Sequence, residues 1–125
     1  MRSRYAGFAL GLGDYLVRTL APSHPDAALP AGDLARQMAS QRERQRFQGL
    51  TILHTEDTAD GGEVLFVARI FERGADRSFA ELSRFERVGG AFRYASGVLV
   101  AGDRLPRDLA TLDRASFLAL AAADA

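Results

Sequence analysis

Polar residues at the start of the chain and in its centre are the first candidates for chemistry. Arg2, Arg4 and Tyr5 fall on the opening turn of a predicted helix, and Glu81 and Ser83 fall on the inward face of a predicted strand. A carboxylate on an apolar face needs a charged or hydrogen-bonding partner. Because a guanidinium binds a carboxylate in a forked geometry, we expect Arg2 or Arg4 to face Glu81. Two interpretations stay open: an ion pair that ties the helix to the sheet, or a polar cluster that lines a pocket.

Proton-transfer chemistry has four candidate residues: Asp14, Tyr15, Glu81 and Tyr94. In a pocket, carboxylate and phenol groups of this kind act as general acids and bases. The alternative for the Asp14-Tyr15 pair is structural, with Asp14 as a helix cap and Tyr15 as an aromatic residue at the edge of the core.

The opposite face of the predicted strands carries three arginines, Arg69, Arg84 and Arg93. Arginines on neighbouring strands form an anion-binding stripe when their register brings them together. The alternative is a solvated outer face or the rim of a dimer, with Glu63 and Glu86 as nearby partners. Together with the first cluster, the predicted ligand-binding residues are Arg2, Arg4, Tyr5, Glu81, Ser83 and Arg84.

Metal, thiol and dinucleotide chemistry finds little support. The chain has no cysteine, which rules out cysteine-based zinc and iron–sulfur sites. Its two histidines, His24 and His54, have no carboxylate at a useful spacing, so we predict no metal site and no cofactor. His24 lies in a proline-flanked turn and is expected to be exposed. The Gly11-x-Gly13 pair lacks the third glycine and the preceding strand of a dinucleotide fingerprint, and no serine sits in a nucleophile elbow.

Length and charge bound the class of protein. A chain of 125 residues suits one domain with a single modest core. The 16 basic residues, all arginine, balance 16 acidic residues, and this neutrality argues against dedicated DNA binding. The apolar stretch at residues 8–12 is far shorter than the roughly 20 residues that span a bilayer. We expect a cytoplasmic protein with neither a membrane nor a nucleic-acid partner, and its arginine- and alanine-rich usage is typical of a GC-rich bacterial genome.

The elements that must position these residues begin with helices. Apolar residues between Tyr5 and Leu20 recur every three or four positions, which is the spacing of one helical face. The segment 11–14 interrupts the pattern, so we predict a break with Asp14 capping a second short helix. A further helix is predicted to begin with Asp33 as its N-cap. A last helix is predicted within residues 103–121, with the alanine-rich residues 121–125 fraying.

After residue 46 the pattern changes to the alternation of strands. Strands are predicted over residues 47–56, 63–73, 78–88 and 91–100, separated by short turns such as Gly89-Gly90. Three successive hairpins give an antiparallel meander. Helices before a meander indicate the α+β class, and we predict a single domain over residues 1–125. Its helical layer, residues 1–46, covers one face of the curved meander, residues 47–100, and leaves a cone-shaped cavity between them.

Several ordered segments resemble the middle domain of the YchJ-like bacterial family. They are MRSRY at residues 1–5, DYL at 14–16, ELSRF at 81–85 and FRYASG at 92–97. The resemblance covers residues 1–97 and implies a nuclear transport factor 2-like, cystatin-related α+β cone. It implies no activity, because the family is largely uncharacterised.

The departures from the family pattern concern zinc and two polar positions. Family members carry a cysteine-rich SEC-C zinc motif before MRSRY and often another at the end, whereas this chain has no cysteine. Either the motifs are absent or they lie outside this sequence. The family's Trp and His are replaced by Leu20 and Ala21, and its Asp by Ser96. No role resting on that His or Asp carries over.

Two functions stay open at this stage. The first is a non-catalytic binding or interaction module with a modest pocket, for a small molecule or a protein partner, with homodimerisation through the open sheet face. The second is a small-molecule enzyme of the isomerase, dehydratase or hydrolase kind, in which Asp14, Tyr15, Glu81 or Tyr94 transfers protons. A zinc-bearing SEC-C partner is a further expectation of the resemblance.

Overall fold

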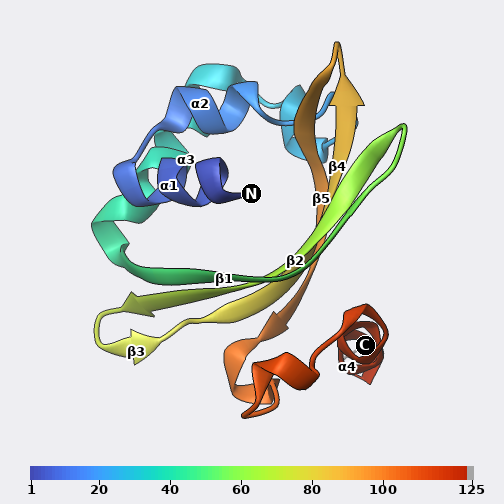
Figure 1. The fold of residues 1–125 in the computed structure, drawn as a ribbon. Coiled ribbons are helices and arrows are strands. Elements are labelled where there is room, and N and C mark those ends of the chain that lie inside the picture. Colours follow the sequence, from blue (N-terminus) through green and yellow to red (C-terminus); the bar gives the residue numbers. More distant parts are fainter. Residues whose placement is uncertain (124–125) are drawn as a thin grey trace.

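The computed structural model describes residues 1–123, in which N-terminal helices pack on a curved antiparallel sheet (Figure 1). The α-helices are α1 Arg2–Leu10, α2 Gly13–Arg18, α3 Ala31–Arg44 and α4 Arg114–Ala123. The strands are β1 Gln45–Asp57, β2 Gly61–Glu72, β3 Ala75–Asp76, β4 Phe79–Val88 and β5 Ala91–Ala101. Three short 3₁₀ turns are η1 Pro25–Ala28, η2 Gly102–Arg104 and η3 Leu109–Thr111. The predicted α+β class is confirmed.

The sheet has five strands in the order β1-β2-β4-β5, with β3 paired to β2, and every pairing within it is antiparallel. The four long strands agree with the predicted ones to within two residues at each end. In the register between β2 and β4, Phe66 lies opposite Glu81 and Val64 opposite Ser83. Glu81 and Ser83 therefore share the face of the apolar β2 residues, as their alternation predicts.

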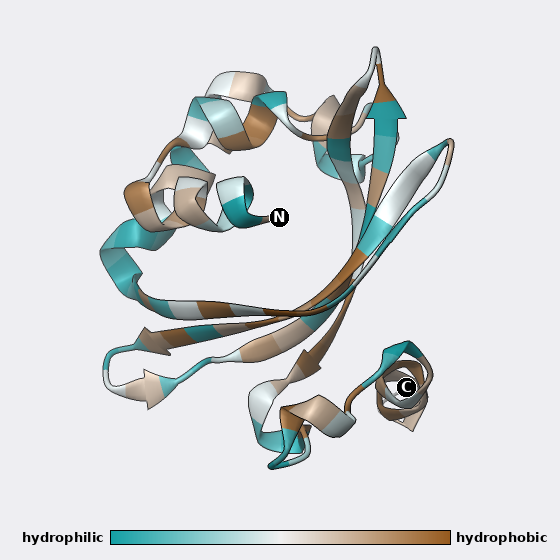
Figure 2. Cartoon of the chain, in the orientation of Figure 1, coloured by the Kyte–Doolittle hydropathy of each residue, from teal (hydrophilic) through white to brown (hydrophobic). Residues whose placement is uncertain are grey.

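The two faces of the sheet are covered by different parts of the chain (Figure 1). On the concave face, Phe66, Ala68 and Ile70 are buried under the N-terminal helices. On the convex face, a second apolar cluster of the strands is buried under the C-terminal segment, where Phe117 has no exposed surface. Figure 2 shows apolar residues concentrated where the long strands cross the middle of the sheet. The helix α4 covers part of the convex face, which was expected to be open. Homodimerisation through the remainder of that face stays a prediction.

The break between α1 and α2 is confirmed, but the predicted cap is wrong. Gly11 adopts a left-handed conformation with φ 70° and ends α1, which is the conformation that glycine tolerates best. Leu12 precedes α2, and Asp14 lies within its first turn with no capping bond from its side chain. Gly13 is required by a close helix crossing, because a Cβ there would lie 2.1 Å from the carbonyl oxygen of Ala35 on α3. The predicted N-cap Asp33 likewise lies inside α3, which begins after Pro30.

The predicted C-terminal helix is present as α4, but it is shorter than the predicted range of residues 103–121 and begins later. Two 3₁₀ turns precede α4, and Asp108 caps the second of them through a bond from the Ala110 amide of 3.1 Å. The helix begins only after Asp113, whose Oδ1 accepts from the Ser116 amide at 2.8 Å. Asp113 thus caps α4 and delays its start. Of the segment predicted to fray, residues 121–123 end α4, and residues 124 and 125 lie outside the described part. No helix within residues 1–123 is long and apolar enough to cross a membrane.

Candidate functional site

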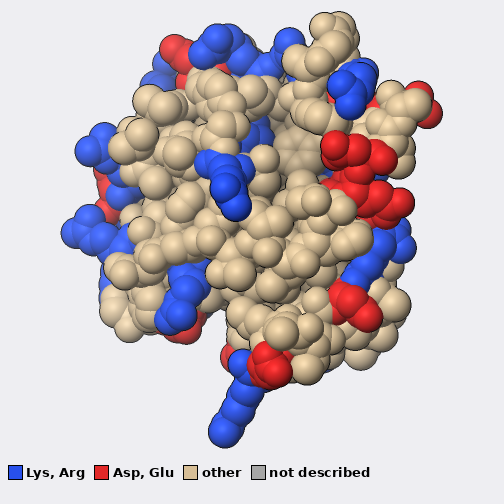
Figure 3. All heavy atoms as spheres, in the orientation of Figure 1, with Lys and Arg blue, Asp and Glu red and all other residues tan. Residues whose placement is uncertain are grey.

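A cavity of about 240 Å³ lies between the N-terminal helices and the concave face of the sheet. Figure 3 shows the molecule hollowed between the helices and the β4–β5 hairpin. The sheet side of the wall is largely apolar, with Phe66, Ala68, Ile70 and Phe79. The polar residues at the wall include Arg4, Tyr5, His24, Glu81 and Tyr94. This combination of an apolar wall with a few polar groups is typical of small-molecule sites, although the volume is modest.

Glu81 is the buried carboxylate of this cavity, with 7% of its surface exposed. Its Oε2 accepts a hydrogen bond of 2.9 Å from the Tyr94 hydroxyl and a second bond from the Ser83 hydroxyl. Ser83 is itself fully buried. Both bonds end on the same carboxylate oxygen, and no group within residues 1–123 donates to Oε1. The carboxyl group therefore keeps one unpartnered oxygen at the cavity wall.

Gly97 on β5 has no side chain, and the hydrogen-bonded Glu81 and Tyr94 side chains fill the space where its Cβ would lie. It pairs with Ser83 in the sheet, and a Cβ at position 97 would lie 2.5 Å from both Glu81 Oε2 and the Tyr94 hydroxyl. Non-bonded heavy atoms do not approach this closely, so any side chain here would displace the carboxylate or the phenol. A glycine at this position is part of the site even though it carries no functional group.

Arg4 does not form the predicted fork with Glu81. Its Nη1 donates to the Leu16 carbonyl at 2.8 Å and to the Thr19 hydroxyl, both at the end of α2. Its guanidinium also stacks over the ring of Tyr94, 4.9 Å from the centroid. Within residues 1–123 no carboxylate lies within ion-pair distance of Arg4, so helix and sheet are joined through the Tyr94 ring instead. Arg2 is exposed on the same helix and is absent from the cavity wall.

Burial dominates the electrostatics of the site. It raises the pKa of Glu81 above its ordinary value, against the lowering effects of the Ser83 and Tyr94 hydrogen bonds and of the Arg4 charge. Burial and the neighbouring Glu81 charge raise the pKa of Tyr94 as well. Burial lowers the pKa of Arg4, but a guanidinium stays protonated in proteins. The cavity thus joins a permanent cation to a carboxyl group that resists ionisation.

Tyr5 is the second polar residue of α1 at the cavity. Its ring packs edge-on against Phe47 with centroids 5.5 Å apart. Its hydroxyl is buried and has no hydrogen-bond partner in the described chain. The other aromatic candidate, Tyr15, donates instead to the exposed Ser3 hydroxyl at 2.6 Å and does not line the cavity. Asp14 is exposed on α2, so the predicted Asp14-Tyr15 pair does not join Glu81 and Tyr94.

His24 was predicted to be exposed and is instead half-buried at the cavity wall. Its ring lies 5.6 Å from that of Tyr94, and its Nδ1 accepts from the Asp26 amide at 3.0 Å. The segment before it pairs with β5, because the Tyr94 amide donates to the Thr19 carbonyl at 2.7 Å. This long-range pairing brings His24 to the site. The proline-flanked turn gave no signal of it.

Of the two interpretations of Arg69, Arg84 and Arg93, the anion-binding stripe is wrong, because the three residues do not come together. Arg84 lies opposite Glu63 in the sheet, whereas Arg69 lies six residues further along the same strand as Glu63, a separation of roughly 20 Å. Arg93 donates to the Arg18 carbonyl. Arg84 also lines a different, more polar depression from the one that holds Glu81. The register, which alternation alone does not fix, separates Arg69 from Arg84.

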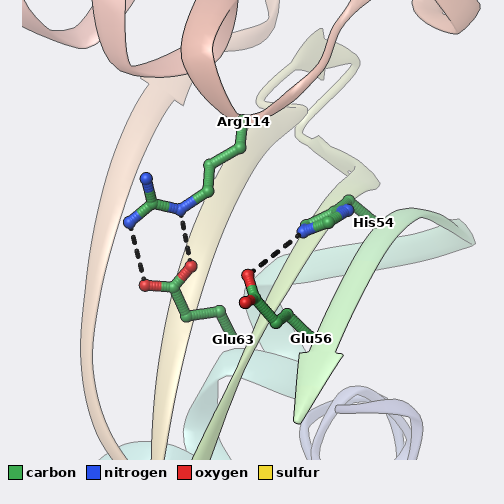
Figure 4. A network of polar contacts seen from close by, with 4 residues as sticks. All are labelled: His54, Glu56, Glu63 and Arg114. Atoms are coloured by element: carbon green, nitrogen blue, oxygen red, sulfur yellow. Dashed lines mark hydrogen bonds and ion pairs between the residues drawn. The ribbon is translucent and has the colours of Figure 1, made fainter. Parts of the chain in front are cut away.

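A second polar group lies near the C-terminal segment, away from the cavity (Figure 4). Arg114 at the start of α4 binds Glu63 through Nε at 2.7 Å and Nη2 at 3.1 Å. His54 Nε2 lies 3.9 Å from Glu56, beyond hydrogen-bond distance. Among residues 1–123, no cluster of three or more His, Asp or Glu side chains is placed to hold a metal ion. The Glu63–Arg114 pair is a half-exposed ion pair that links the start of α4 to β2.

Comparison with known proteins identifies a family. The profile of the family described as YchJ, middle NTF2-like domain, matches residues 1–97. A UPF0225 protein of Enterobacter sp. (strain 638) is 38% identical over 99 residues, which are 78% of this chain and 62% of that protein. A UPF0225 protein of Streptomyces coelicolor is 42% identical over 99 residues, 78% of this chain and 69% of that protein.

Solved structures include one similar chain with the same fold. It is the solution structure of RPA3114, a SEC-C motif containing protein from Rhodopseudomonas palustris, with a TM-score of 0.66 and 33% identity. The match covers 78% of this chain and 73% of that chain. This chain spans about 62% of the length of the Enterobacter relative and of the UPF0225 protein YchJ from Shigella dysenteriae. The C-terminal segment with α4 follows the 97 residues that the family profile matches.

Proposed function

The chain belongs to the YchJ family, whose middle NTF2-like domain it matches over residues 1–97, and from this premise we propose that it is a non-catalytic binding module. Its ligand is a small, largely apolar molecule held in the cavity between the helices and the sheet. One observation carries the proposal: the buried Glu81 keeps an unpartnered oxygen at the wall of an apolar cavity. Oε1 is not among the fully buried atoms of residues 1–123 that lack a partner, so it is accessible, and a ligand group can take the place of water as its hydrogen-bond donor.

The arrangement of the acid–base groups favours binding over catalysis. Proton transfer needs a donor or acceptor that faces the substrate. The Tyr94 hydroxyl is already committed to Glu81, and its raised pKa makes it a poor acid. Asp14 and Tyr15 point to other parts of the molecule.

Neutral probes test the binding function directly. We would titrate ¹⁵N-labelled protein with 1-hexanol and with indole and follow the backbone amide signals. Shifts centred on Phe66, Ala68 and Tyr94 are expected, because these residues line the cavity. The absence of shifts, or shifts confined to α4, would contradict the proposal.

A substitution that fills the cavity tests whether the probes bind there. Ala68 is buried at the wall, so the longer side chain of Ala68→Met occupies part of the cavity and should abolish the shifts. Ala119→Met adds the same atoms at an exposed position of α4 and should leave the shifts unchanged. Equal probe binding by both variants would place the probes elsewhere.

A second candidate function, enzymatic proton transfer, is favoured by the same unpartnered Glu81 oxygen together with the raised pKa of that carboxyl. A buried carboxylate of this kind abstracts protons next to a carbonyl in isomerases and dehydratases. The test is exchange of the α-hydrogens of cyclohexanone in D₂O, followed by NMR. Acceleration by the wild type that Glu81→Gln abolishes would establish catalysis, whereas no acceleration leaves the binding module as the function.

A further inference from the structure

Arg4 is a buried cation with no anionic partner among residues 1–123. Only 4% of its surface is exposed. Removing a charge from water is costly unless another charge or several hydrogen bonds compensate it. Arg4 is compensated by two acceptors at the end of α2 and by the faces of the Tyr94 and Phe8 rings. The site therefore holds a positive charge that its own carboxylates do not neutralise by direct contact.

The Arg4 guanidinium donates its hydrogen bonds from one of its three nitrogens. Both bonds leave from Nη1, and no described acceptor bonds to Nε or Nη2. The Nε–Nη2 edge is one of the two that bind a planar carboxylate through two parallel bonds. Arg4 lines the cavity and so can offer these donors to a ligand.

Tyr5, the residue after Arg4, supplies another donor at the wall of the same cavity. Its hydroxyl is buried without a partner, and Tyr5 lines the same cavity. A buried hydroxyl usually finds a hydrogen-bond partner, so an orphan at a cavity wall indicates a group that a ligand satisfies. A carboxylate bound at Arg4 has a second oxygen with lone pairs available for this donor.

The rest of the cavity limits the ligand to one anionic group. Phe66, Ile70 and Phe79 form an apolar wall on the sheet side, which suits a hydrocarbon body. Among the described residues that line the cavity, Arg4 is the only arginine, so a second negative charge would have no guanidinium to bind. We infer, resting on the proposed function, that the ligand is a small apolar monocarboxylic acid whose carboxylate is bound by Arg4 and Tyr5.

The test compares probes that share one body and differ in the polar end. Dissociation constants for hexanoate, hexanamide, hexylamine and 1-hexanol would be measured by NMR titration at neutral pH. Hexanoate should bind about tenfold more tightly than hexanamide, because only the carboxylate accepts charge-assisted bonds from Arg4. Equal or weaker binding of hexanoate, with 1-hexanol still bound, would overturn the inference and leave the proposed function intact. Binding of none of the four probes would overturn both.

Tyr5→Phe is the decisive variant, because it removes only a hydroxyl that has no partner in the protein. A structural role predicts unchanged or higher stability and no effect on ligands. The inference predicts several-fold weaker hexanoate binding with 1-hexanol affinity and folding retained. Arg4→Gln should abolish the preference for the carboxylate, and Arg2→Gln, exposed on the same helix, is its control. Full hexanoate affinity in Tyr5→Phe would contradict the assignment of Tyr5 whether or not the Arg4 variant folds.

Discussion

The Tyr94 hydroxyl on β5 donates a hydrogen bond of 2.9 Å to Oε2 of Glu81 on β4. The ring of the same tyrosine carries the guanidinium of Arg4 on its face, 4.9 Å from the centroid. Tyr94 therefore contacts both the Arg4 guanidinium of α1 and the Glu81 carboxylate of β4, and it links these two charged groups. In a buried site this indirect contact is stronger than it would be in water, because the local dielectric constant is low.

Removal of the Tyr94 hydroxyl is expected to destabilise the fold. Tyr94→Phe leaves the Ser83 hydroxyl as the donor to Glu81, and loss of a bond to a buried polar group costs about 1–3 kcal/mol. The free energy of unfolding in urea measures the effect. The control is Tyr15→Phe, whose hydroxyl bonds to the exposed Ser3 and whose cost should stay within about 0.5 kcal/mol. Equal costs for the two variants would contradict the importance of the Tyr94–Glu81 bond.

A side chain at position 97 is expected to disrupt the same network. The methyl group of Gly97→Ala would meet Glu81 Oε2 and the Tyr94 hydroxyl at 2.5 Å, and relieving such overpacking costs about 1–3 kcal/mol. Urea unfolding again gives the number, and probe binding in the cavity should weaken with it. Gly49→Ala is the matched control, because a Cβ there meets no atom within 4 Å. If both variants unfold at the same urea concentration, the space at Gly97 is not a constraint.

The sheet was predictable from the sequence because its signals are local. Alternation of apolar residues located β1, β2, β4 and β5 and placed Glu81 on the face of Phe66. The two-residue strand β3 is too short to show alternation. The C-terminal segment was predicted as one helix because Leu109, Leu112, Phe117 and Leu120 have roughly helical spacing. In the structure, Leu112 and Phe117 reach the same apolar cluster from an extended segment and from a helix.

Site residues were predictable from the sequence only where a charged residue falls on an otherwise apolar face. Glu81 is recognisable as a carboxylate on an apolar face, and the sequence predicts Arg2 or Arg4 as its partner without deciding between them. Their actual relation depends on Tyr94, which the sequence does not connect to Arg4. His24 was missed because the pairing of Leu20 with Tyr94, which brings it to the cavity, is a contact between residues far apart in the chain. Gly97 carries no functional group that a sequence pattern could have revealed.

Stability should fall with rising pH because of Glu81. Its pKa is raised in the folded state above the 4.5 of an ordinary glutamate, mainly by burial. Its contribution is therefore fully present below the unfolded pKa and is lost as the pH rises through the folded pKa. Urea unfolding of the wild type and of Glu81→Gln, between about pH 4 and about pH 8, measures the difference, which should move in favour of the variant as the pH rises.

Glu63 is the internal comparison for this pH dependence, with the opposite sign. Hydrogen bonds from Arg114 lower its pKa, so its contribution is present above its unfolded pKa and is lost as the pH falls through the folded value. Glu63→Gln should therefore lower the stability at neutral pH, and its difference from the wild type should shrink as the pH falls through the acidic range. A constant difference between the wild type and Glu81→Gln across the whole range would show that Glu81 has the same pKa in both states.

The C-terminal helix is expected to be part of the folding unit, although it follows the residues that the family profile matches. Phe117 of α4 has no exposed surface and packs with Leu65, Leu82 and Val100 on the convex face. Truncation of such a side chain costs about 3–5 kcal/mol, a large part of the stability of a small domain. Phe117→Ala should lower the free energy of unfolding by that amount in a single cooperative transition. Phe92→Ala, at a residue with 41% exposure, should cost less than about 1 kcal/mol. If Phe117→Ala left the main urea transition unchanged, α4 would be an appendage, and the apolar convex face would be free for another partner.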